Sequence, residues 1–132
     1  MSELLKKARA VRENAYAPYS NFKVGAAIRT TSGGEFIGCN VENAAYPQGT
    51  CAEAGAIAAM ILAEGRQIKA IAVVGDSPDP VTPCGGCRQK IREFAEPTIP
   101  ILIGDLKQLR LRQTLADLLP HSFGPEYLLN EP

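Results

Sequence analysis

Hydrophobic and polar residues follow one another along the chain in patterns that predict short helices and strands. Leu4, Leu5, Ala8, Val11 and Ala15 recur at helical spacing among charged residues, which predicts an amphipathic helix that ends near Pro18. Residues 24–31 and 35–41 form two extended runs joined by Gly33-Gly34, so we expect a hairpin there.

The middle of the chain is more apolar and alternates between helical and extended patterns. Residues 52–63 are small and almost entirely apolar, which is typical of a helix buried on most of its faces. Residues 68–75 and 99–104 are rich in β-branched residues, as in buried strands, and residues 85–94 between them are helical in pattern. The alternation predicts a layered α/β domain in which helices pack on the faces of a mixed sheet.

Composition narrows the class of partner. Lys plus Arg number 14, as do Asp plus Glu, and only 6% of residues are aromatic, which argues against a nucleic acid as partner. No apolar run approaches the roughly 20 residues that cross a bilayer, and charges interrupt the N-terminal segment where a signal peptide is apolar. We therefore expect a soluble, cytoplasmic protein that does not bind a membrane.

Three of the four cysteines stand at the starts of predicted helices, and their spacing indicates a metal site. Cys51 begins the motif Cys-Ala-Glu, and Cys84 and Cys87 belong to the motif Pro-Cys-Gly-Gly-Cys. A helix N-terminus stabilises the thiolate, which is the form that binds metal. Three protein ligands leave the fourth tetrahedral position open, as in catalytic rather than structural zinc sites. We expect one zinc ion on these three sulfur atoms.

Glu53 lies two residues after Cys51 and is not needed as a metal ligand, so it can transfer protons beside the metal. Zinc can lower the pKa of a bound water molecule to about 7. A ligand-x-Glu segment followed by Pro-Cys-x-x-Cys is the signature of zinc deaminases that act on cytosine or adenine. The alternative is a structural zinc site closed by Cys39. No second cysteine lies two or three residues from Cys39, which favours a small buried hydrophobic residue instead.

With these motifs in place, the chain resembles the short cytidine deaminases, which bind zinc through three cysteines and usually form homotetramers. Residues 22–27 resemble the opening strand of that family, and residues 38–47 resemble its nucleoside-binding stretch. The resemblance implies one catalytic domain over residues 1–132, folded as a three-layer α/β/α sandwich with a mixed, roughly five-stranded sheet. It also implies hydrolysis of cytidine and 2'-deoxycytidine to uridine and 2'-deoxyuridine with release of ammonia, a reaction of pyrimidine salvage.

The resemblance assigns roles to individual residues as well. Glu53 would carry protons while zinc-bound hydroxide attacks C4 of the pyrimidine ring. Asn40 and Glu42 would bind the ribose hydroxyls. The other substrate-binding residues would be Phe22 against the ring, Ala52, Tyr46, and Phe123, which would reach the site of a neighbouring subunit.

One position departs from the family pattern. Many relatives with three cysteines carry arginine directly after the catalytic glutamate, whereas this chain has Ala54. Three thiolates give a divalent zinc centre a net negative charge, which another cation has to balance. Arg88, next to Cys87, is our candidate. We expect Arg88→Ala to reduce turnover or metal affinity more than the same change at a surface arginine such as Arg110.

Two other functions fit part of the pattern. A deaminase of a cytosine-containing antibiotic or a modified nucleoside would use the same chemistry, although Asn40 and Glu42 favour a ribose. A non-catalytic zinc-binding module would use the metal for folding or as a platform for a partner, and it would release no ammonia from any nucleoside.

Overall fold

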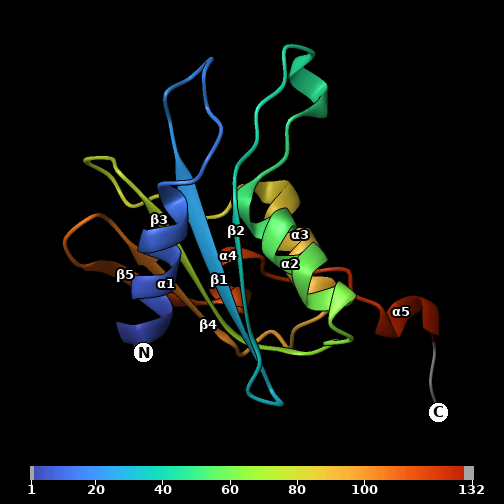
Figure 1. Ribbon diagram of the computed structural model, residues 1–132. Helices are drawn as coiled ribbons and strands as arrows, with labels where there is room; N and C mark the ends of the chain where they lie inside the picture. Colours follow the sequence, from blue (N-terminus) through green and yellow to red (C-terminus); the bar gives the residue numbers. More distant parts are fainter. Residues whose placement is uncertain (1, 130–132) are drawn as a thin grey trace.

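The computed structural model describes residues 2–129 and contains one mixed sheet with helices on both faces (Figure 1). The strands are β1 (Val24–Thr30), β2 (Glu35–Cys39), β3 (Ile68–Gly75), β4 (Pro100–Gly104) and β5 (Leu109–Thr114). Their spatial order is β2-β1-β3-β4-β5. The β3–β4 pair is parallel and the other three pairs are antiparallel, so the five-stranded mixed sheet is confirmed.

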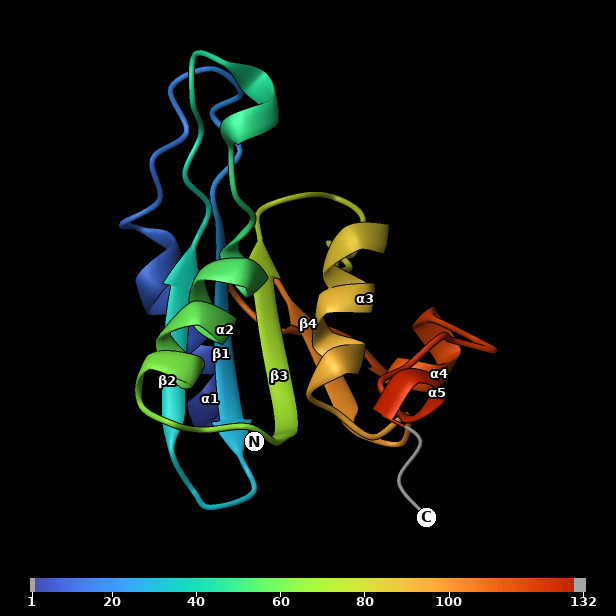
Figure 2. The ribbon, with the colours of Figure 1, turned by 90° about the vertical axis from the view of Figure 1, so that its right-hand side faces the viewer.

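The helices form the two outer layers. They are α1 (Ser2–Arg12), α2 (Ala52–Leu62), α3 (Gly85–Glu93), α4 (Leu115–Leu118) and α5 (Glu126–Leu129), with one turn of 3-10 helix, η1, at Tyr46–Gln48. In Figure 2, α2 and α3 lie in front of the sheet and α1 lies behind it. No helix within residues 2–129 is both long and apolar enough to span a membrane.

Alternating strand residues supply two separate cores, because neighbouring side chains of a strand point to opposite faces of the sheet. Ala27, Ala72 and Leu102 face α1, where they meet Leu4 and Ala8. The residues that alternate with them face α2 and α3, and this larger core includes Ala26, Ile28, Ile71, Val73, Ile101 and Ile103. The predicted three-layer α/β/α arrangement is therefore present.

The first helix is shorter than its pattern predicted. It ends at Arg12 rather than near Pro18. Beyond it the backbone pairs with the segment after β2: the N–H of Tyr16 donates to the carbonyl of Asn40 at 3.0 Å, and that of Glu42 donates to the carbonyl of Tyr16 at 2.8 Å. These bonds replace a further helical turn, and they bring residues 16–22 beside residues 40–42.

Helix α2 lies unusually close to β2, at Gly38. A Cβ atom at this glycine would lie 2.3 Å from the backbone nitrogen of Ala56 and 2.5 Å from the carbonyl oxygen of Ala52. The absence of a side chain thus sets the distance between the helix and the sheet. The N-terminal ends of α2 and α3 both lie at the end of the sheet where β3 finishes (Figure 2).

Candidate active site

Cys51, Cys84 and Cys87 converge where α2 and α3 begin. Cys51 is the N-cap of α2, Cys84 is the N-cap of α3, and Cys87 lies in the first turn of α3. Their sulfur atoms all lie within 4.8 Å of one another, and the Sγ atoms of Cys51 and Cys84 are 3.9 Å apart. Two thiolates on one tetrahedral zinc stand about 3.8 Å apart, given Zn–S bonds of about 2.3 Å. The three sulfurs therefore fit zinc.

Cys39 does not belong to this group. It ends β2, and its backbone carbonyl lies 3.7 Å from where a Cβ of Gly55 would be. Within residues 2–129 the converging ligand atoms come from three cysteines only, and all four cysteines are free thiols. The geometry thus gives no support to a structural zinc site closed by Cys39.

The thiols differ in their surroundings. Desolvation raises the pKa of Cys51 and Cys87, whereas a hydrogen bond from the backbone N–H of Cys87 lowers the pKa of Cys84. The Cys87 side chain is fully buried. A buried thiolate is unfavourable without a nearby positive charge, so this cluster requires a cation to hold its sulfurs in the ionised form.

Glu53 lies in the first turn of α2, beside the cysteines, and is only 3% exposed. Burial raises the pKa of its carboxyl group above the ordinary value, while hydrogen bonds from its own backbone N–H and from the Cys87 thiol, and then the positive charge of Lys90, act in the opposite direction. A carboxyl group that is buried at the floor of an open cavity is suited to exchange protons with a bound molecule.

A cavity of about 450 Å³ opens above Glu53, within the size range of small-molecule sites. Its walls come from the loop before β1 and the first residue of β1, from residues 40–53, from Val73 of β3, and from the segment that ends at Cys84. Of the residues predicted from sequence, the cavity is lined by Cys51, Cys84, Glu53, Phe22, Asn40, Glu42, Tyr46 and Ala52. The fold thus collects most of the candidate site in one place.

Asn40 joins two parts of the cavity wall. Its side-chain oxygen accepts the N–H of Val24 at 2.8 Å, and its amide nitrogen donates to the carbonyl of Phe22 at 2.9 Å. An amide nitrogen carries two donors. One N–H of Asn40 is therefore left for a ligand.

Glu42 holds the loop that contains Tyr19 and Ser20. One carboxylate oxygen accepts the N–H groups of Tyr19 and Ser20 at 2.9 and 3.1 Å, and the other accepts the Ser20 hydroxyl. The Ser20 hydroxyl, followed by the two N–H groups, lowers the pKa of Glu42. A carboxylate offers about four lone pairs, so one acceptor position is left for a ligand.

Phe123 lies away from this cavity. It follows α4, is 53% exposed, and stacks on Tyr127 with ring centroids 5.0 Å apart. Its carbonyl accepts a hydrogen bond from the Gln89 side chain at 2.8 Å. Within one chain it is therefore not part of the site, and the predicted contact with a neighbouring subunit's site stays a prediction.

Arg88 donates only to neutral oxygens among the residues that the structure describes. Its guanidinium bonds the carbonyls of Pro83 and Leu118, both at 2.7 Å, and the Thr82 hydroxyl at 3.0 Å. Arg88 thus supports the segment that carries Cys84, while its predicted role in charge balance stays a prediction. Arg110, which we chose from the sequence as a surface arginine to compare with Arg88, is not a free surface residue. Its side chain is 25% exposed and donates hydrogen bonds to three acceptors.

The cavity is also lined by residues that sequence reasoning did not assign to the site, namely Ser20, Val24, Val41, Gly49, Thr50, Val73, Val81 and Thr82. A signal for the last two was available, because the proline-rich segment 76–83 runs directly into Cys84 and its end has to approach the metal ligands. Ser20 carried no signal, since only the fold brings it to Glu42.

Comparison with known proteins gives a consistent result. The family model for the cytidine and deoxycytidylate deaminase zinc-binding region matches residues 1–103. A cytidine deaminase of Sporosarcina psychrophila is 42% identical over 128 residues, covering 97% of this chain and 94% of the relative. One from Halalkalibacterium halodurans is 41% identical over 123 residues, covering 93% of each. The crystal structure of cytidine deaminase from Burkholderia pseudomallei matches with a TM-score of 0.86 and 46% identity, covering 92% of this chain and 98% of that chain. This chain therefore belongs to the cytidine and deoxycytidylate deaminase family.

Proposed function

We propose that this protein hydrolyses cytidine and 2'-deoxycytidine to uridine and 2'-deoxyuridine, with one zinc ion per chain as cofactor and residues 1–132 as its catalytic domain. The observation that carries the proposal is the cluster of three cysteine sulfurs, two of which, those of Cys51 and Cys84, line one cavity together with the buried Glu53. Family membership supports the same reaction.

The chemistry divides between the metal and Glu53. Cys51, Cys84 and Cys87 would hold the zinc ion, which when bound would make a water molecule acidic enough to act as a nucleophile near neutral pH. Glu53 takes a proton from the water as its oxygen adds to C4 of the ring, and delivers that proton to N3. Glu53 then moves the second proton from the new hydroxyl to the exocyclic amine. The C4–N bond breaks, ammonia leaves, and C4 becomes a carbonyl carbon.

Two polar side chains at the cavity wall select a nucleoside over a free base. The side-chain N–H of Asn40 that does not bond Phe22 donates to a ribose oxygen. The lone pair of the Glu42 carboxylate that accepts no protein donor accepts a ribose hydroxyl. Phe22 packs against the pyrimidine ring, while Ala52 and Tyr46 complete the wall. This pairing of one donor with one acceptor also favours a nucleoside over a cytosine-containing antibiotic that lacks a ribose.

We further propose that the protein works in pyrimidine salvage in the cytoplasm, as a homotetramer. Cytoplasmic reductants keep thiols free to bind metal. Exposed apolar side chains support assembly: Phe123, Tyr127, Leu128 and Leu129 are each more than half exposed near the C-terminus. In a tetramer, Phe123 would reach a neighbouring subunit's cavity. Mass determination in solution tests this, and a monomer with full activity would contradict it.

The decisive assay compares wild type with Glu53→Gln. Glutamine keeps the size of the side chain but cannot carry protons, so we expect cytidine turnover to fall by a factor of about 10² or more while zinc content stays at one per chain. Cytidine conversion is followed by absorbance and zinc by atomic absorption. Wild-type protein that contains zinc but releases no ammonia from cytidine or deoxycytidine would instead favour a non-catalytic zinc module.

A further inference from the structure

The segment 76–83 leads directly to the predicted metal ligand Cys84, and the end of the segment next to Cys84 forms part of the cavity wall. It contributes Val81 and Thr82 to the cavity lining. It lies outside the strands and helices, and Pro78, Pro80 and Pro83 remove three of its backbone N–H donors. No helix or strand ladder therefore fixes this segment, and side chains from other parts of the chain can hold it in place through its carbonyls.

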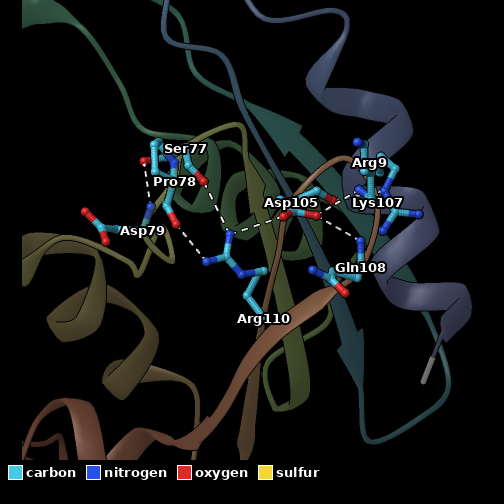
Figure 3. A network of polar contacts seen from close by, with 8 residues as sticks. All are labelled: Arg9, Ser77, Pro78, Asp79, Asp105, Lys107, Gln108 and Arg110. Atoms are coloured by element: carbon cyan, nitrogen blue, oxygen red, sulfur yellow. Dashed lines mark hydrogen bonds and ion pairs between the residues drawn. The ribbon is translucent and has the colours of Figure 1, made fainter.

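Arg110 supplies such donors at the beginning of the segment (Figure 3). It lies on β5, and its guanidinium donates to the carbonyl of Pro78 at 2.7 Å and to that of Ser77 at 3.4 Å. The same side chain forms an ion pair with Asp105 at 3.2 Å. A planar guanidinium can serve several acceptors in fixed directions at once, which an ammonium group cannot do.

Asp105 is itself held in place, so that it fixes the guanidinium of Arg110. Its carboxylate accepts the backbone N–H groups of Lys107 and Gln108, both at 2.8 Å, in the turn between β4 and β5. Its carbonyl accepts the side chain of Arg9 on α1 at 3.1 Å, as Figure 3 shows. Arg110 thus ties the segment to a turn that is anchored on both the sheet and α1.

The far end of the segment is held independently. Arg88 bonds Thr82 and Pro83, and Val81 packs on Gly75, where a Cβ would lie 2.9 Å from a methyl group of Val81. Two arginines from different elements, Arg110 and Arg88, thus hold the two ends of one cavity wall.

We propose that Arg110 is a positioning residue for nucleoside binding, which, together with Asp105, keeps the segment 76–83 in the conformation that completes the cavity. This inference rests on the proposed function. Arg110 acts on substrate affinity, because it holds the end of the segment that is remote from the metal, whereas Arg88 acts next to Cys84.

The expected kinetic signature follows from a conformational equilibrium. Without Arg110 the segment 76–83 samples positions in which the cavity wall is displaced. The apparent affinity for cytidine then falls in proportion to the fraction of protein molecules in which the wall is in place. A hydrogen bond to a charged group contributes roughly 1.5 to 3 kcal/mol, which limits how far the equilibrium can shift, so KM for cytidine should rise by up to about tenfold to 10²-fold. Once substrate is bound the wall is in place, so kcat changes less than about twofold.

The test compares Arg110→Ala, Arg110→Lys and the matched control Arg112→Ala in the zinc-loaded protein. Arg112 is on the same strand and is exposed, and its side chain forms no hydrogen bond or ion pair with any residue within 2–129. We expect Arg110→Ala to raise KM with kcat and zinc content preserved, Arg110→Lys to have an intermediate effect, and Arg112→Ala to behave like wild type. Lysine keeps the positive charge, so Arg110→Lys can be used for the kinetic comparison if Arg110→Ala does not fold.

Hydrogen exchange of residues 76–82 provides a readout that does not need activity. The amides of this segment should exchange faster in Arg110→Ala than in wild type or Arg112→Ala. Unchanged exchange and unchanged KM would overturn the inference, as would a loss of kcat and zinc with KM preserved. If wild type turns over no cytidine while the exchange pattern is as expected, the proposed function fails and the role of Arg110 in holding the segment stands.

Discussion

Replacing Gly38 by alanine is expected to damage both stability and activity, because this glycine sets the position of the helix that carries Glu53. A Cβ atom at residue 38 would lie 2.3 Å from the nitrogen of Ala56, 2.5 Å from the oxygen of Ala52 and 2.8 Å from the carbonyl carbon of Gly55. All three atoms belong to the backbone of α2, so no side-chain rotation can relieve the contact.

The magnitude follows from these distances. Ordinary Cβ contacts begin at 3.4 Å, so α2 has to move away from β2 by about 1 Å. Overpacking of this kind costs about 1 to 3 kcal/mol in the free energy of unfolding. Since Glu53 moves with the helix, and a misplacement of about 1 Å can lower turnover 10²-fold, kcat/KM for cytidine should fall by about that factor.

Gly55 provides a matched control at the same interface. A Cβ there would meet its nearest neighbours at 3.6 to 3.8 Å, which is ordinary contact, and Gly55 is inside α2. Gly55→Ala should therefore leave activity intact and stabilise the protein by up to about 1 kcal/mol. Urea unfolding and cytidine kinetics measure both variants. The reasoning is refuted if Gly38→Ala unfolds like wild type, or if Gly55→Ala is equally destabilising.

Three further changes test other parts of the site. Arg88→Ala should lower zinc affinity or turnover about tenfold relative to Arg112→Ala, because it releases the segment before Cys84; competition with a zinc chelator measures this. The hydrogen bonds that lower the pKa of Glu42 stabilise the folded state fully at pH values above the ordinary pKa of glutamate. This stabilisation is lost as the pH falls through the lowered pKa of Glu42. The destabilisation by Glu42→Gln should therefore be full at pH 6 and shrink below pH 4 in urea titrations. Removal of zinc by a chelator should abolish ammonia release, and added Zn²⁺ should restore it; activity that survives complete removal would exclude the proposed mechanism.

A sequence pattern predicts a helix or strand well when the residues of that element, rather than its pairing with distant segments, determine where it begins and ends. The strand over 68–75 was predicted to the residue, because its β-branched run is buried on both faces. The end of α1 and the edge strand β5 were not foreseen. Helix α1 ends where Tyr16 pairs with a distant segment, and β5 alternates Leu109 and Leu111 with arginines in a half-exposed pattern.

The same distinction applies to the site. Cys51, Glu53, Cys84 and Cys87 could be proposed from the sequence because their chemistry lies within short motifs at helix starts. The role of Arg110 could not be predicted in this way, since the two carbonyls that it holds, those of Ser77 and Pro78, lie more than 30 residues away along the chain. Nothing local distinguishes it from Arg112, two residues on.

The central claim is that three cysteine sulfurs hold one zinc ion and leave its fourth position open beside Glu53. X-ray absorption at the zinc edge of the purified protein measures this directly. We predict three sulfur neighbours at about 2.3 Å and one lighter neighbour, at one zinc per chain. Four sulfur neighbours would mean that Cys39 closes the site, and fewer than three would mean that the cluster of Cys51, Cys84 and Cys87 does not bind the metal; either result contradicts the account.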